Sequence, residues 1–160
     1  MATKTTGAAR ELEPAELAAW RGLLRVHSEL VKALDAELLA CHRLPLISYE
    51  VLINLQAAPD RRRRMSDLAD SVLLSRSGMT RLVDRLERDG LLERASCSSD
   101  GRGYFAVLTE AGEELLARAR PTHLDGVRER FLRHFDEGEL GAMAAYWERV
   151  VPGAAAMEKT

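Results

Sequence analysis

Apolar residues recur at intervals of three and four near the start of the chain, which is the spacing of one face of a helix. This stripe covers about six helical turns and consists of Leu17, Trp20, Leu24, His27, Val31, Leu34 and Leu38, with a histidine inside it. A second stripe near the other end consists of Leu140, Met143, Trp147 and Val150. A helix this long in a small protein needs a partner for its apolar side. We therefore expect residues 13–44 and 110–155 to form dimerisation helices.

Between these helices the pattern changes to shorter, closely spaced elements. Ser66 can cap a short helix, and after a turn either Ser75 or Ser77 can cap a longer one. The inward side of the longer helix consists of Met79, Leu82, Val83 and Leu86. Polar and mostly basic residues fill its remaining faces, so it has a buried side and a charged outside.

A hairpin follows this helix. Gly90 supplies a left-handed stop, residues 91–96 and 104–108 are predicted to be the two strands, and Gly101 and Gly103 place Arg102 at or near the tip of the turn. The order helix, turn, helix, hairpin is that of a winged helix-turn-helix. The sequence therefore predicts a DNA-binding region over residues 45–109.

The connecting segments complete the expected fold. A helix capped by Ser48 runs to Pro59, and Thr109 caps another that Pro121 should bend or break. Residues 1–12 have the composition of a flexible arm. We expect one intertwined domain, mainly α, with a small two- or three-stranded β wing.

Charge is concentrated where the motif lies. The 160-residue chain has a net charge of −2, but residues 61–103 contain 10 arginines and 7 acidic residues. Most of this excess comes from the tetra-arginine Arg61 to Arg64. It is either a solvated loop between helices or a segment that contacts phosphate or senses an inducer.

Three pieces of sequence in this order resemble the MarR (multiple antibiotic resistance regulator) family of bacterial transcription factors. They are SRSGMTRLVDRLERDGLLER at residues 75–94, the pair Asp100 and Arg102, and VLTEAGEELL at residues 107–116. The resemblance is best over about residues 65–120, and it implies a transcription regulator, expected to be a repressor, whose terminal helices form a two-fold dimer. Members often carry a basic residue beside the wing arginine. This chain has glycines there, so Arg102 carries the charge of the wing alone.

A two-fold dimer would place two recognition helices in the major groove at half-sites about 10 base pairs apart, so the DNA site should be an imperfect palindrome. The residues free to reach base edges are Arg76, Ser77, Thr80 and Arg81. We expect Ser66, Ser75 and Arg85 to contact the DNA backbone. Arg102, supported by Asp100, should enter the minor groove.

The family resemblance also implies control by a small aromatic or phenolic ligand. Candidate pocket residues are Trp20, Arg21, Arg25, His27 and Tyr49. The alternative for His27 is an ordinary buried histidine, and for Trp20 a place in the core or the dimer interface. A second form of control is thiol oxidation at Cys41, beside His42 and Arg43, or at Cys97. Neither cysteine matches the position that peroxide-sensing members use.

Other classes of protein have less support. The chain has no phosphate loop, nucleophile elbow or clustered carboxylate pair, and its four histidines lack metal-ligand spacing, so we expect no enzyme, cofactor or metal. A winged helix used for protein contact is the stronger rival, but it should lack the arginines named above. With no long apolar run and no signal-like N-terminus, we expect a cytoplasmic protein, nucleoid-associated when bound to DNA, without membrane contact.

Overall fold

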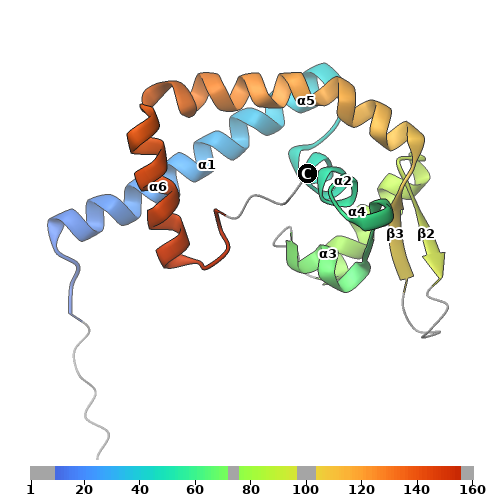
Figure 1. Cartoon of the computed structure of the whole chain (residues 1–160), viewed down its shortest axis with the longest axis horizontal. Helices are drawn as coiled ribbons and strands as arrows, with labels where there is room; N and C mark the ends of the chain where they lie inside the picture. Colours follow the sequence, from blue (N-terminus) through green and yellow to red (C-terminus); the bar gives the residue numbers. More distant parts are fainter. Residues whose placement is uncertain (1–9, 72–75, 97–103, 156–160) are drawn as a thin grey trace, which may run out of the picture.

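The computed structural model describes residues 10–71, 76–96 and 104–155, with the side chains of all of these except Asp70, Ser71 and Arg76. The elements in chain order are α1 (Pro14–His42), α2 (Leu46–Gln56), η1 (Pro59–Arg61), β1 (Arg62–Arg64), α3 (Met65–Ser71), α4 (Arg76–Arg88), β2 (Leu92–Ser96), β3 (Tyr104–Leu108), α5 (Glu110–Arg130), η2 (Leu132–His134) and α6 (Glu137–Val150). Figure 1 shows two long helices, α1 and α5, on one side of a group formed by α2, α3, α4 and the sheet.

The pair α1 and α5 forms the backbone of the molecule. The two helices pack antiparallel, because His42 near the end of α1 contacts Thr122 while Glu37, one turn earlier, pairs with Arg130 further along α5. Helix α1 begins at Pro14, and Glu13 and Glu16 form a capping box at this end. This start agrees with the predicted one at residue 13. The long helix predicted from the first apolar stripe is thus confirmed.

The predicted cap of α2 is wrong. This helix begins at Leu46, and its first backbone N–H donates to Asp35 Oδ1 of α1 at 2.8 Å. Ser48 lies inside the helix and is buried. The cap is therefore supplied across the interface with α1, which a local pattern cannot reveal.

The tetra-arginine is not a loop throughout. Arg62–Arg64 forms β1, the edge of a three-stranded antiparallel sheet with the order β1-β3-β2. The hairpin strands β2 and β3 agree with the predicted ones to within one residue. The wing sheet thus has three strands, the larger of the two expected numbers.

The helix does not break at Pro121, because α5 continues as one helix from Glu110 to Arg130, and the alternative of a bend there stays a prediction. A proline ring removes one helical hydrogen bond, but α5 is held on both sides of it by residues that are buried, Leu116 and Ala119 before it and Gly126 after it. The start of α5 is as predicted: Thr109 Oγ1 accepts from the Gly112 N–H at 3.1 Å.

The core lies where the second half of α1, α2, α3, α4, the sheet and α5 meet. In contrast, the first half of α1 and the whole of α6 leave large apolar side chains exposed, and no residue of α6 is buried. These exposed residues are Leu12, Trp20, Leu23, Leu24, Val26 and Val31 before or on α1, and Tyr146, Trp147 and Val150 on α6. In the described part of the chain, no single helix has the length and apolarity to cross a membrane, although α1 and α2 pass that test jointly across a bend of 83°.

Candidate nucleic-acid interface

Helix α4 presents one side to the core and the other to solvent, as its residue spacing predicts. Met79, Leu82, Val83 and Leu86 are buried. Ser77, Thr80 and Arg81 are exposed and lie together on the outward side. Because α4 begins at Arg76, Ser77 lies inside the helix and does not cap it. Ser75 and the side chain of Arg76 lie outside what the structure describes.

Arg85 anchors the recognition helix to α2. Its Nη2 donates to Ser48 Oγ at 3.2 Å, and Ser48 is the one polar residue among the buried residues of the described chain. A buried hydroxyl needs such a partner. In this structure Arg85 therefore links α2 and α4. Its expected contact with the DNA backbone stays a prediction.

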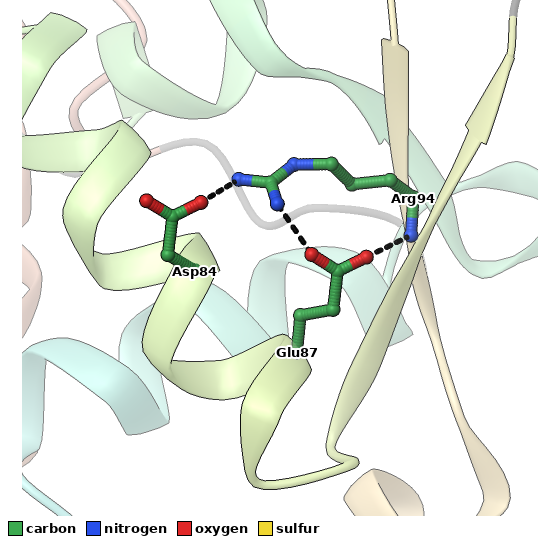
Figure 2. Close-up of polar contacts among 3 residues, drawn as sticks. All are labelled: Asp84, Glu87 and Arg94. Atoms are coloured by element: carbon green, nitrogen blue, oxygen red, sulfur yellow. Dashed lines mark hydrogen bonds and ion pairs between the residues drawn. The ribbon is translucent and has the colours of Figure 1, made fainter.

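A charged cluster ties α4 to the wing, as Figure 2 shows. The guanidinium of Arg94, on β2, donates to Asp84 and to Glu87 of α4, and the backbone N–H of Arg94 donates to Glu87 Oε1 at 3.2 Å. Burial alone would lower the pKa of Arg94, but its bonds with the two carboxylates raise it above the ordinary value. The wing is thereby fixed relative to the helix it flanks.

The ion pairs of Arg94 with Asp84 and Glu87 are not among the contacts predicted from the sequence. The available signal was the spacing of Asp84 and Glu87, which puts two carboxylates on neighbouring turns of one helix face. Two acids in the middle of a basic helix need a cation nearby, and the strand that follows brings one.

Backbone contacts fix the base of the hairpin. Gly90 has a φ of 74°, the left-handed conformation expected at a helix end, and Leu91 N donates to Leu86 O at 2.9 Å. Thr109 Oγ1 donates to Gly90 O at 2.7 Å, which joins the two ends of the wing. Asp100, Arg102 and Cys97 fall on residues outside the described part of the chain.

The predicted cap of α3 differs from the structure. This helix begins at Met65, so Ser66 is inside it, and Ser66 Oγ donates to Asp67 Oδ1 at 2.9 Å. Ser66 is exposed, and its contact with DNA backbone stays a prediction.

The candidate ligand residues fall into two environments. Trp20, Arg21, Arg25 and His27 are exposed on the first half of α1 in the single chain, so the pocket role of His27 and its alternative, a buried histidine, both stay predictions. Tyr49 is only 2% exposed. Burial raises the pKa of Glu50 on α2, and the neighbouring His27 opposes this shift.

Tyr49 has neighbours that the sequence did not indicate. Its ring lies 4.6 Å from the ring of His123 on α5. Burial raises the pKa of Tyr49, and the charge of Arg120 opposes this shift. Burial lowers the pKa of His123, whose Nδ1 is buried without a hydrogen-bond partner among the described residues. Beside it, His42 Nε2 and Thr122 Oγ1 are 2.8 Å apart.

The thiol site loses part of its support. Cys41 is exposed and unpaired near the end of α1. Of the two neighbours expected to activate it, His42 has its imidazole hydrogen-bonded to Thr122, and the role of Arg43 stays a prediction. Among the described residues there is also no cluster of three side chains suited to hold a metal ion.

Comparison with known proteins gives consistent results. The sequence profile of the MarR family matches residues 44–103. The chain is 34% identical to AbsC, a MarR family transcriptional regulator from Streptomyces coelicolor, with a TM-score of 0.83 over 89% of this chain and 95% of that one. Sco3205, a MarR family regulator from the same organism solved in complex with DNA, is 32% identical, with a TM-score of 0.86 over 95% of each chain.

A curated relative is similar over a shorter stretch. The transcriptional repressor MprA of Escherichia coli (strain K12) is 33% identical over 73 residues, which are 46% of this chain. The match spans 42% of the length of MprA, and the match to another curated transcriptional regulator, from Bacillus subtilis, spans 40% of that protein. The matched stretches are thus less than half of these proteins.

Proposed function

Because this chain belongs to the MarR family of transcription regulators, we propose that it binds pseudo-palindromic double-stranded DNA as a homodimer and regulates transcription, as a repressor. The observation that carries this proposal is the exposed polar side of α4, braced against the wing by Arg94. A relative that is 32% identical over nearly the whole chain has been solved in complex with DNA, which supports it.

On this proposal, the outward side of α4 reads bases in the major groove. Arg81 and Arg76 can each grip guanine O6 and N7 with two hydrogen bonds, and Thr80 can touch the methyl group of thymine. Ser77 lies on the same side of the helix. A winged helix used only for protein contact would not need these groups.

The remaining DNA contacts would set position rather than sequence. Ser66, Ser75 and Arg85 would bind backbone phosphates, with Arg85 exchanging its bond to Ser48 for a phosphate. Arg102, oriented by Asp100, would enter the narrow minor groove, where negative potential is strongest.

The exposed apolar side chains of α1 and α6 support the homodimer. Trp20 and Leu24 on α1, and Trp147 and Val150 on α6, are each more than a third exposed. Such contiguous apolar surface marks an interaction site. We assign residues 13–44 and 110–155 to the dimer, residues 45–109 to DNA binding and residues 1–12 to a flexible arm.

A small aromatic or phenolic ligand would modulate DNA affinity from the region of Trp20, Arg21, Arg25, His27 and Tyr49. The support is the position of Tyr49 on α2. This helix contacts α5 through Tyr49 and α4 through Ser48. The protein would have no catalytic activity, and as a DNA-binding regulator it would act in the bacterial cytoplasm.

The decisive experiment is selection of bound duplexes from a random DNA pool. The expected product is an imperfect palindrome with half-sites about 10 base pairs apart. Recovery of sequences without two-fold symmetry, or of none, would contradict the proposal.

A further inference from the structure

Two arginines of the tetra-arginine lie on the outer face of the wing sheet. Directly paired residues share a face of a sheet, and the register pairs Arg64 with Phe105 and Arg62 with Val107. The alternate pair, Arg63 with Ala106, faces the core, where Ala106 is buried. Arg62 and Arg64 therefore point away from the core, on the same side as Phe105.

Phe105 holds both arginines in place. The Cζ atoms of Arg62 and Arg64 lie 5.3 and 5.6 Å from the centre of its ring. A cation–π contact at an exposed site contributes about 0.5–1 kcal/mol. Because the ring is uncharged, it restrains the two guanidinium groups without neutralising them.

Two acidic residues of the described part of the chain lie toward one end of this face. Asp60 is 3.3 Å from Arg62, with the two side chains 51% (Arg62) and 74% (Asp60) exposed, and Glu93 is level with Val107. Arg61 pairs with Glu113 and is engaged there. An exposed pair such as Arg62 with Asp60 is weak and can exchange for a phosphate.

Arg62 and Arg64 lie close in the chain, or through their strand partner, to two segments assigned to DNA contact. Arg64 comes two residues before Ser66, and its partner Phe105 comes three residues after Arg102. Three residues of chain span at most about 11 Å. The minor groove is about 6 Å wide and is bordered by phosphates, one per strand for about every 3.4 Å of helix axis. With Arg102 in the minor groove as proposed, a surface within about 11 Å of it can reach these phosphates.

We propose that Arg62 and Arg64, stacked on Phe105, form a phosphate-binding surface on the outer face of the wing sheet that clamps the DNA backbone beside the minor groove. This inference rests on the proposed DNA binding. It adds a second basic contact to a wing that otherwise offers the charge of Arg102 alone, and it assigns a role to the tetra-arginine. The contact is with phosphate, so it is independent of base sequence.

The test is the salt dependence of DNA affinity. The full chain is titrated by fluorescence anisotropy with its selected operator and with a random duplex, between about 50 and 200 mM salt. The variants are R62Q/R64Q, which removes the charges, R62K/R64K, which keeps them without the planar group, and R64Q alone. The matched control for R64Q is R10Q, which removes one exposed arginine of the N-terminal arm that is also paired with an acid, Glu13. Thermal unfolding checks that each variant is folded.

Two phosphate contacts per subunit predict that R62Q/R64Q lowers the slope of log affinity against log salt by about 3 to 4 for the dimer, since each contact contributes about 0.9. The loss should be equal on both duplexes, R64Q should give about half of it, and R62K/R64K and the control should stay near the wild type.

Three results would overturn the inference. If R62Q/R64Q keeps the wild-type slope, the surface does not touch DNA. Equal losses in the lysine and glutamine variants would mean that the arginines only support Phe105. A wild-type chain that binds neither duplex would refute the proposed function, and the inference with it, whereas the first two results leave the proposed function standing.

Discussion

Replacing Arg94 with methionine tests whether the wing is fixed to α4 by charge. Methionine keeps an unbranched side chain of similar reach and removes both ion pairs in Figure 2. The side chains are partly exposed, 23% for Arg94, 47% for Asp84 and 37% for Glu87. The contribution of each pair to the free energy of unfolding should therefore be intermediate. Exposed ion pairs contribute up to about 1 kcal/mol, and buried hydrogen bonds to charged groups contribute about 1.5–3 kcal/mol.

Two such bonds give an expected loss of about 1–3 kcal/mol in the free energy of unfolding. Left without a cation, Asp84 and Glu87 repel each other by a few tenths of a kcal/mol more, as like charges on neighbouring turns do. For a chain of this size, 1 kcal/mol shifts Tm by about 2–4 °C. The expected loss is therefore between about 2 and 12 °C.

The assay is urea unfolding followed by circular dichroism, with a double-mutant cycle between R94M and E87Q. A coupling energy of about 1 kcal/mol is expected, because the two side chains are in direct contact. The matched control is R118M, whose partner Glu114 is 3.9 Å away and whose side chain is 62% exposed, so its loss should stay below about 0.5 kcal/mol. If R94M and R118M unfold alike, or if the cycle shows no coupling, the reasoning is refuted.

Other changes probe the remaining parts of the structure. R81A should weaken operator binding by about 1–3 kcal/mol and relax selectivity at one base position in gel shifts; equal loss on random DNA would contradict base reading. G112A should lower Tm, because a Cβ there would lie 2.2 Å from Leu91 O, whereas G22A, with nothing within 4 Å, should gain up to about 1 kcal/mol of stability. Burial lowers the pKa of His123 below 6.5, so the imidazole binds a proton more readily in the unfolded state than in the folded state. The free energy of unfolding should therefore fall as pH drops from 6.5 through the lowered pKa. H123Q should flatten this fall in urea titrations between about pH 7 and 5. W147D should shift the sedimentation of the protein toward a monomer, and an unchanged dimer would remove α6 from the interface.

Features set by local spacing could be predicted from the sequence. The buried side of α4 follows from the intervals between Met79, Leu82, Val83 and Leu86, and Thr109 caps α5 within its own turn. The two hairpin strands are adjacent in sequence and share one turn, so their pairing is local as well.

Features that depend on distant partners could not be predicted in the same way. Arg62–Arg64 has no strand-like alternation of apolar and polar residues, and it becomes a strand because β3, over 40 residues later, supplies its hydrogen bonds. The cap of α2 comes from Asp35 on another helix. Pro121 is tolerated because tertiary packing on α1 outweighs one lost hydrogen bond.

Consecutive residues of α2 show why this distinction bears on function. Ser48 accepts a hydrogen bond from Arg85 of α4, while the ring of Tyr49, the next residue, lies at a tilt against His123 of α5. Side chains of consecutive helical residues point about 100° apart, so one short helix contacts both neighbours at the same level. The orientation of α4 relative to α5 is therefore set through α2. The sequence shows that α2 has an inward side, but only the folded chain shows that this side is shared between the helix that would read DNA and the helix that would form the dimer.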